Sequence, residues 1–133
     1  MKIIVINNNK DFSRAYSKGR ACGSSVCLAY FRKNGTRENR LGISTPRKVG
    51  NAVQRSRARR VVRAAYAAVY ESFPKGYDIV VCAREATAAC KSTDIQRFFE
   101  NKLIPSMKRP DEGSRVKATK EKSGQRKKNE RGS

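Results

Sequence analysis

The chain contains no histidine and few acidic side chains, and both shortages limit the chemistry that it could perform. Without histidine, no histidine-based general base or catalytic triad is possible. No glycine-rich nucleotide-binding fingerprint is present either. The carboxylates before residue 109 are scattered, without the spacing of a metal-binding loop: Asp11, Glu38, Glu71, Asp78, Glu85, Asp94 and Glu100. The sequence therefore predicts a binding protein with no catalytic residues and no metal site.

The shortage of acids leaves a large positive charge. Lys and Arg number 31 against 11 Asp and Glu, which gives a formal net charge of +20. Such a charge repels itself in the compact state and is normally neutralised by a polyanionic partner. Nucleic acid is the first candidate for that partner, and an anionic membrane surface is the second.

Long hydrophobic runs are also absent. The N-terminal run Ile3-Ile4-Val5-Ile6 is too short for a signal sequence or a membrane span. We therefore expect a soluble cytoplasmic protein.

The four cysteines, Cys22, Cys27, Cys82 and Cys90, do not form the short paired motifs of zinc sites. Cys27 and Cys82 lie inside apolar runs, where a free thiol packs like a small core residue. This pattern favours reduced, structural thiols in a cytosolic protein.

Composition divides the chain into residues 1–108 and a tail, residues 109–133. The tail has nine basic and four acidic side chains, and Val116 and Ala118 are its only hydrophobic residues. It cannot bury enough apolar surface to offset the entropy of ordering, so we expect a disordered basic tail. Residues 1–108 keep a net charge of +15, since +20 less the tail's +5 leaves that value.

Within residues 1–108, hydrophobic periodicity predicts alternating elements. Helices are expected at residues 11–16, 51–72 and from 92 or 93 to 105; strands are expected at 26–31, 41–45 and 78–83, with a further short strand at 3–6. The strands at 26–31 and 41–45 are expected to form an antiparallel pair. We interpret the whole as an α+β sandwich, with helices on one side of a small sheet.

The stretch GNAVQRSRARRVVR, residues 50–63, contains five arginines among fourteen residues. In a helical projection with Val53 at zero, the apolar residues Val61, Val62, Ala64, Ala65, Ala68 and Val69 cover about 20° to 180°. Arg55, Arg59, Arg60 and Arg63 cover about 200° to 340°, and Arg57 lies near 40° as the exception. The helix is therefore expected to be apolar on one side and basic on the other.

A charged face is most often simply solvated, but such faces usually mix both signs. Here no carboxylate occurs between Glu38 and Glu71. A face of one sign destabilises a helix until phosphates lie against it, and arginine binds phosphate oxygens bidentately. Gly50 and Asn51 add open backbone N–H groups at the helix start. This segment therefore predicts a phosphate-binding surface.

Phe12, Tyr16 and Tyr30 lie among basic or small polar residues. Exposed aromatic rings stack on unpaired bases in single-stranded RNA recognition. The other interpretation is that these rings belong to the core, and for Phe12 and Tyr16 the sequence favours neither.

The stretch R-K-V-G-N-A-V-Q-R-S-R-A-R-R-V-V-R, residues 47–63, resembles the arginine-rich signature of the bacterial ribonuclease P protein subunit, approximately K-x-G-x-A-V-x-R-N-R-x-K-R-x-x-R. Further segments resemble this family in the same order: the first helix with Asp11, Phe12, Tyr16 and Gly19, the strand at 41–44 and the strand at 78–84. The similarity covers about residues 8–108.

Membership in this family implies a ribosomal protein S5 domain 2-like α-β sandwich with a small, mostly antiparallel sheet. It also implies a left-handed β-α-β crossover, which is rare because such connections are nearly always right-handed. It also implies a ribonucleoprotein whose RNA subunit, with bound Mg²⁺, removes the 5′ leader of precursor tRNA. Mg²⁺ would be held mainly by the RNA, and no DNA or membrane partner is implied.

The resemblance implies two binding surfaces on the protein. The catalytic RNA would be bound by Arg47, Lys48, Asn51, Arg55, Ser56, Arg57, Arg59, Arg60 and Arg63. A cleft between the sheet and the first helix would hold the single-stranded 5′ leader through Phe12, Tyr16 and Tyr30.

Two positions depart from the family signature: Ser56 replaces an asparagine, and Arg59 replaces the usual lysine. A ribosomal or other structural RNA-binding protein would also explain the charge, although not the signature together with the three aromatic residues. A nuclease that acts without RNA is a third possibility, and the inventory of side chains argues against it.

Overall fold

The computed structural model describes residues 3–109, and the predicted tail lies outside them apart from Arg109. Its elements in chain order are β1 (Ile4–Val5), α1 (Asn9–Lys18), β2 (Arg20–Gly23), β3 (Cys27–Lys33), β4 (Arg40–Ser44), the 3₁₀ turn η1 (Arg47–Val49), α2 (Ala52–Ala68), the 3₁₀ turn η2 (Tyr70–Ser72), β5 (Tyr77–Ala83), α3 (Glu85–Ala89), α4 (Ser92–Phe98), the π-helical segment η3 (Phe99–Leu103) and α5 (Ile104–Lys108).

The five strands form one mixed sheet in the order β1-β4-β5-β3-β2. The β1–β4 and β4–β5 pairs are parallel, whereas β3–β5 and β2–β3 are antiparallel. The α+β class is thus confirmed, but the predicted antiparallel pair between 26–31 and 41–45 is wrong. β5 lies between these strands because its run of apolar residues is stabilised best with a partner on each side.

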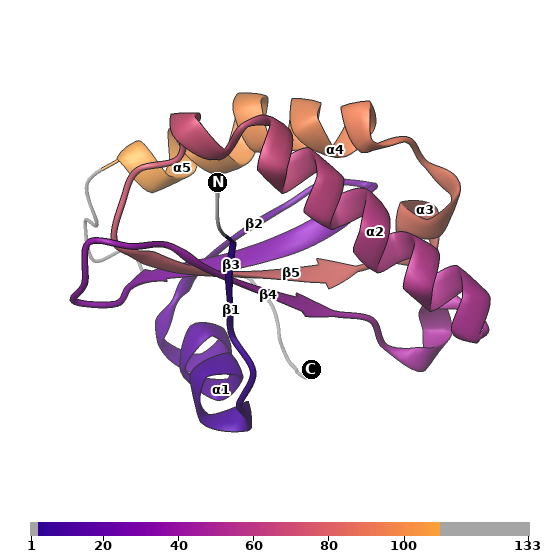
Figure 1. The fold of residues 1–133 in the computed structure, drawn as a ribbon, viewed down its shortest axis with the longest axis horizontal. Helices are drawn as coiled ribbons and strands as arrows, with labels where there is room; N and C mark the ends of the chain where they lie inside the picture. Colours follow the sequence, from indigo (N-terminus) through magenta and orange to yellow (C-terminus); the bar gives the residue numbers. More distant parts are fainter. Residues whose placement is uncertain (1–2, 110–133) are drawn as a thin grey trace.

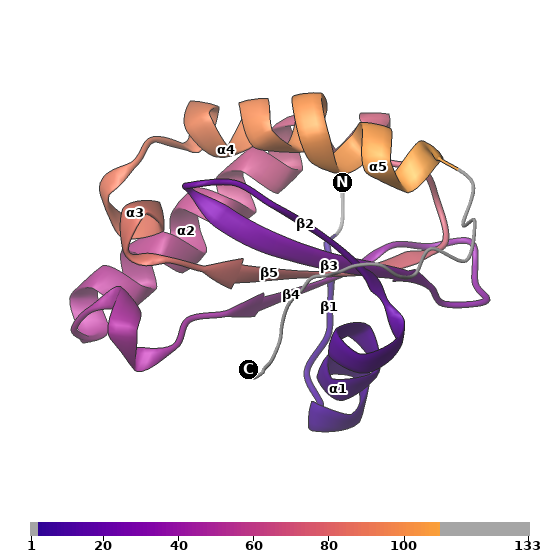
Figure 2. The ribbon, with the colours of Figure 1, turned by 180° about the vertical axis from the view of Figure 1, so that it is seen from behind.

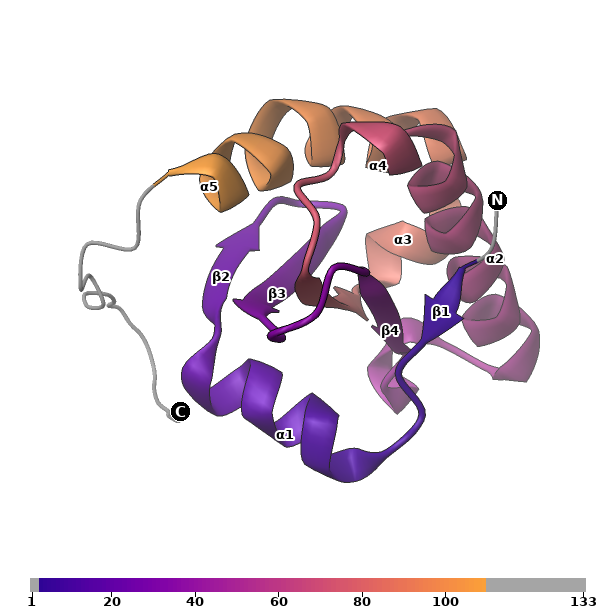
Figure 3. The ribbon, with the colours of Figure 1, turned by 60° about the vertical axis from the view of Figure 1, so that its left-hand side comes forward.

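The connection from β4 through α2 to β5 is left-handed. In Figure 1 the chain runs along β4, returns above the sheet through α2 and enters β5 behind β4, and Figure 3 shows the same order of strands from another side. This rare hand agrees with the expectation from the family resemblance. It brings α2 over the edge of the sheet where β4 and β1 lie.

The helices cover both faces of the sheet. In Figure 1, and from behind in Figure 2, α2, α4 and α5 lie above the sheet and α1 lies below it. The prediction of helices on one side is therefore wrong for α1. β5 explains the arrangement, because Ile79 and Val81 join the main core whereas Val80 packs with Ile6 and Ala15 on the α1 side.

The last helical region starts as predicted and continues beyond the predicted end. Pro105 falls in the first turn of α5, where a missing N–H is tolerated, and the preceding π-helical segment provides the wider turn. The helix predicted over 51–72 ends at Ala68, with η2 completing that segment. The short elements β2 and α3 were not predicted.

The main core contains one buried hydroxyl without a partner. Tyr66 of α2 is fully buried against Phe73, with ring centroids 5.1 Å apart, and its hydroxyl has no hydrogen-bond partner within residues 3–109. Burial raises the pKa of this hydroxyl, so it remains a protonated donor.

We expect Tyr66→Phe to raise the free energy of unfolding by about 1 kcal/mol, because it removes an unsatisfied buried polar group and keeps the ring. Urea unfolding would measure the change. Tyr77→Phe is the matched control: the Tyr77 hydroxyl donates to the backbone oxygen of Met107 at 3.2 Å, so its removal should cost about 1 kcal/mol. A loss of stability in both variants would contradict the prediction.

Candidate nucleic-acid interface

The start of α2 is fixed by a glycine and a capping box. Gly50 has a φ of 145°, and a Cβ there would lie 2.0 Å from Oε1 of Gln54. The Asn51 side chain accepts from the backbone N–H of Gln54 at 2.9 Å, and the Gln54 side chain accepts from that of Asn51 at 2.8 Å. Arg47 and Lys48 are exposed in η1 just before this cap. The cap therefore sets the direction in which the arginines of α2 point.

The predicted two-sided character of α2 is present, with its apolar side shifted. The buried residues are Ala58, Val61, Val62, Ala65 and Tyr66. Val53, the zero of the projection, is 75% exposed, and Ala64 and Ala68 are also exposed. For Val53 the reason is visible in Figure 1, where the first turns of α2 extend past the end of the sheet.

The basic side of α2 has no acidic partner among residues 3–109. Arg57, Arg59, Arg60 and Arg63 are exposed and Arg55 is half-buried. The ion pairs within residues 3–109 join Asp11 to Arg14 and Arg40, Asp78 to Arg40, and Asp94 to Arg97. The positive charge of α2 is thus not neutralised by the described part of the chain.

Arg55 and Arg57 donate hydrogen bonds to backbone oxygens outside α2. Arg55 donates to the backbone oxygen of Gly50 at 3.3 Å. Arg57 donates to the backbone oxygens of Ala88 at 2.7 Å and Cys90 at 3.4 Å, so its guanidinium links α2 to the end of α3. Arg57 therefore has a structural role that helical spacing could not indicate.

The two departures from the family signature contact each other. Arg59 donates through Nη1 to Oγ1 of Thr45 at 2.7 Å and through Nη2 to Oγ of Ser56 at 3.4 Å. The planar guanidinium donates to both hydroxyls from two separate nitrogens in a fixed orientation. A lysine has a single ammonium nitrogen and could not bridge the two hydroxyls in this way. Ser56 thus acts as an acceptor that orients Arg59.

The aromatic cluster, Phe12, Tyr16 and Tyr30, lies on the α1 side of the sheet. The rings of Tyr16 and Tyr30 meet edge to face with centroids 5.0 Å apart, and Phe12 is 6.4 Å from Tyr16. Tyr16 is 41% exposed, whereas Phe12 and Tyr30 are half-buried against a small core. The cluster is therefore partly core and partly surface, which combines the two interpretations that the sequence left open.

Burial, followed by the neighbouring Cys82 thiol, raises the pKa of the Tyr16 hydroxyl. This hydroxyl and the Cys82 sulfur are 3.7 Å apart. Tyr16 therefore presents a protonated hydroxyl and a partly exposed ring on this side of the sheet.

An ionic network that the sequence did not reveal holds α1 on the sheet. Arg40 donates to Asp78 through Nε at 2.8 Å and through Nη2 at 2.6 Å, and its Nη1 lies 3.2 Å from Oδ2 of Asp11 in α1. The Asn8 side chain donates to Asp11 at 2.9 Å and lowers the pKa of that carboxyl, with further help from Arg40. Because Asp11 neighbours Phe12, this network positions the aromatic cluster.

The cysteines are free thiols. Burial raises the pKa of Cys27 to about 12 and also raises the pKa of Cys82 and Cys90, so these thiols remain protonated and weakly nucleophilic. Among residues 3–109 no cluster of three or more His, Cys, Asp or Glu side chains could hold a metal ion. No helix in that range has the length and apolarity needed to cross a membrane.

An α+β protein with an unneutralised arginine face and aromatic rings on the other side of its sheet belongs to the class of RNA-binding proteins. A family model described as Ribonuclease P matches residues 2–105. The chain is 35% identical over 104 residues to the ribonuclease P protein component of Clostridium botulinum, covering 77% of this chain and 94% of that relative.

Solved structures show the same similarity. The RNase P protein of Staphylococcus aureus superposes with a TM-score of 0.67 at 33% identity, covering 79% of this chain and 96% of that one. The RNase P protein of Thermotoga maritima gives a TM-score of 0.68 at 27% identity, covering 80% and 97%. The chain therefore belongs to the ribonuclease P protein family. It is a protein subunit of the ribonucleoprotein endonuclease that processes the 5′ ends of precursor tRNA.

Proposed function

We propose that the basic side of α2 binds the catalytic RNA of ribonuclease P, and that the aromatic cluster contacts the single-stranded 5′ leader of precursor tRNA. The observation that carries the first part is the row of exposed arginines without a carboxylate partner in residues 3–109. Phosphates would supply the missing negative charge and release counterions from the RNA.

In detail, the RNA-binding surface would comprise Arg47, Lys48, Asn51, Arg55, Ser56, Arg59, Arg60 and Arg63, with Arg57 at its border. Ser56 would act through Arg59, and Asn51 through the helix start that it caps. α2 and α1 lie on opposite sides of the sheet (Figure 3), so two RNA segments could be bound at the same time, and the two surfaces approach each other where Phe12, Arg59 and Arg63 line one pocket.

The protein would supply no catalytic group. Phosphodiester hydrolysis would be performed by the RNA subunit with Mg²⁺ bound mainly by that RNA, since the chain has no histidine and its described part offers no metal-ligand cluster. We further propose that this assembly acts in the cytoplasm, where precursor tRNA would be processed.

The test is cleavage of precursor tRNA by a bacterial ribonuclease P RNA at low Mg²⁺ concentration, with and without the purified chain. We expect the chain to increase the rate of leader removal, and the chain without RNA to give no cleavage. No increase would favour a ribosomal or other structural RNA-binding protein, and cleavage by the chain alone would indicate a nuclease in its own right.

Tyr16→Ala tests the leader contact in the same assay, because base stacking on an aromatic ring contributes about 1–3 kcal/mol. We expect about tenfold weaker binding of precursor tRNA by the assembled ribonucleoprotein and unchanged binding of mature tRNA, which has no leader. An equal loss for both RNAs would mean that the Tyr16 ring supports the core only.

A further inference from the structure

The guanidinium of Arg59 is oriented by acceptors from two different elements. Its Nη1 donates to Oγ1 of Thr45 at 2.7 Å, and its Nη2 donates to Oγ of Ser56 at 3.4 Å. Ser56 belongs to α2, as Arg59 does, whereas Thr45 directly follows the last residue of β4. The shorter bond therefore comes from outside the helix and links the basic side of α2 to the end of β4.

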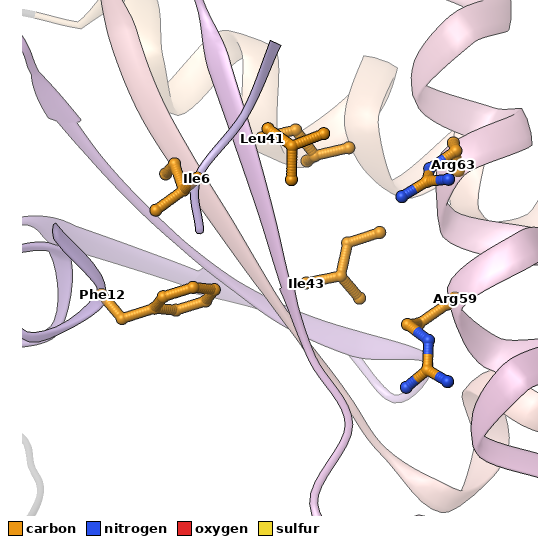
Figure 4. A pocket seen from close by; sticks show the side chains of 7 residues that line it. Ile6, Phe12, Leu41, Ile43, Arg59 and Arg63 are labelled. Atoms are coloured by element: carbon orange, nitrogen blue, oxygen red, sulfur yellow. The ribbon is translucent and has the colours of Figure 1, made fainter. Parts of the chain in front are cut away.

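The alternation of side chains along β4 places Thr45 on the α2 side of the sheet. Ile43 packs against the main core, which α2 covers, whereas Gly42 faces α1. Because successive side chains of an extended chain point to opposite faces, Thr45 continues the row of Ile43. Figure 4 shows Arg59 and Arg63 on the side of α2 that faces Ile43. The Thr45 hydroxyl is thus supplied by the fold at the place that the Arg59 side chain reaches.

Hydroxyl partners orient a guanidinium without neutralising it. Arg40, by contrast, pairs with the carboxylates of Asp11 and Asp78, so its charge is balanced within the fold. Arg59 has no carboxylate partner among residues 3–109 and keeps its full charge. Bonds to two hydroxyls also leave further N–H donors of the guanidinium for an anion. This arrangement presents a charged donor group in a fixed orientation, which suits a phosphate.

Neighbouring arginines on this side of α2 are not held in this way. Arg60 and Arg63 line the same open trough as Arg59, with a volume of about 660 Å³, but their guanidiniums make no hydrogen bond or ion pair within residues 3–109. A long side chain that is free in solution loses rotamer freedom when it binds a partner. Arg59 has less freedom to lose, because Thr45 and Ser56 already restrict it.

We propose that Thr45 is a positioning residue for RNA binding: its hydroxyl, together with that of Ser56, holds Arg59 in the orientation in which the guanidinium binds a phosphate of the catalytic RNA. The proposal rests on the function proposed above, because it takes the basic side of α2 as the surface for that RNA. It adds a residue that lies outside the arginine-rich segment. It also gives arginine at position 59 a role that lysine, with a single nitrogen, could not fill.

Thr45→Val tests the hydroxyl while keeping the shape and branching of the side chain. Binding of the full-length variant to a bacterial ribonuclease P RNA, without substrate, should weaken about fivefold, the effect of one lost hydrogen bond. Thr45→Ser keeps the hydroxyl and should bind as the unmodified chain does. Thr93→Val, at an exposed threonine of α4, is the matched control and should leave the affinity unchanged.

The decisive comparison repeats Thr45→Val in a chain that already carries Arg59→Ala. A positioning residue acts through Arg59, so in this background the loss of the hydroxyl should change the affinity by less than about twofold. An equal loss in both backgrounds would overturn the proposal, because Thr45 would then support the fold or contact the RNA by itself. No loss from Thr45→Val in the otherwise unmodified chain would overturn it as well.

Arg59→Lys separates orientation from charge. The slope of log affinity against log salt should stay the same because the charge is kept, while the affinity should fall about fivefold because the hold on two hydroxyls is lost. A lysine variant that binds as tightly as the unmodified chain would show that the two-point hold contributes nothing to binding, and the proposal would fail.

Failure of the proposed function gives a different result. If the unmodified chain shows no salt-dependent binding to the catalytic RNA, the proposed function fails, and the role of Thr45 fails with it. If the chain binds and Arg59→Ala lowers the salt slope while Thr45→Val changes nothing, only the role of Thr45 is wrong.

Discussion

Replacing Arg40 by methionine should lower the free energy of unfolding by about 3 kcal/mol, measured by urea unfolding. Asp78 is 2% exposed and receives two hydrogen bonds from Arg40, at 2.8 and 2.6 Å. Without Arg40 this buried carboxylate keeps, among the side chains of residues 3–109, only the neutral amide donor of Asn34, at 3.0 Å. Leaving a buried charge largely unpaired is much more costly than losing a surface contact.

Arg97→Met is the matched control. Arg97 also pairs with a carboxylate, Asp94 at 3.0 Å, but its side chain is 71% exposed, so we expect a loss of about 0.5 kcal/mol or less. Equal losses for the two variants would contradict the assignment of Asp78 as a buried, Arg40-dependent carboxylate.

The Arg40 variant should also affect the aromatic cluster. The 3.2 Å contact between Arg40 and Asp11 is the ionic link from the sheet to α1, and Asp11 directly precedes Phe12. In the Arg40 variant that remains folded at low temperature, we expect α1 to be held less firmly against the sheet.

How far the sequence predicts this fold depends on how local each feature is. The amphipathic pattern of α2 and the apolar run of β5 are contained within single segments, and both elements were predicted close to their observed bounds. The order of the strands is not local, because β5 is separated from β4 by the whole of α2. Sequence proximity favoured pairing β3 with β4, whereas in the folded sheet β5, buried along most of its length, lies between them.

The same reasoning applies to the candidate interface. Helical spacing predicted which arginines of α2 point away from the core. The polar surroundings of Phe12, Tyr16 and Tyr30 singled out the aromatic residues, and the family resemblance then implied their role. Spacing could not show that Arg57 bonds to Ala88 and Cys90, or Arg59 to Thr45, because those partners come from other elements. Nor could it show Phe12 beside Arg59 and Arg63, since α1, β4 and α2 meet only in the folded chain.

The second large effect is expected from replacing Arg59, Arg60 and Arg63 together by alanine. Each arginine that contacts a phosphate contributes about 0.7 to 0.9 to the slope of log affinity against log salt, so the slope for the ribonuclease P RNA should fall by about 2 to 3. Near physiological salt the affinity should fall about a hundredfold. Filter binding over a series of salt concentrations would measure both quantities, with Arg97→Ala as the control outside α2.

Stability should change in the opposite direction in this triple variant. Arg59 and Arg63 are spaced i, i+4, so their like charges destabilise the free helix, and alanine has the highest helix propensity. We therefore expect the triple variant to unfold at the same or a slightly higher urea concentration than the unmodified chain, because these two gains at least offset the loss of the hydrogen bonds from Arg59 to Thr45 and Ser56. Arg57→Ala should behave differently, losing stability with the hydrogen bonds to Ala88 and Cys90 while lowering the salt slope less.

These opposite changes distinguish a binding surface from a structural one. If the arginines stabilised the fold, their removal would lower stability and RNA affinity together. If they were only solvated, RNA affinity would not change. A binding surface predicts a third result, in which RNA binding weakens and the free energy of unfolding does not fall. In that case the like charges of α2 destabilise the free protein, and phosphates neutralise them in the complex.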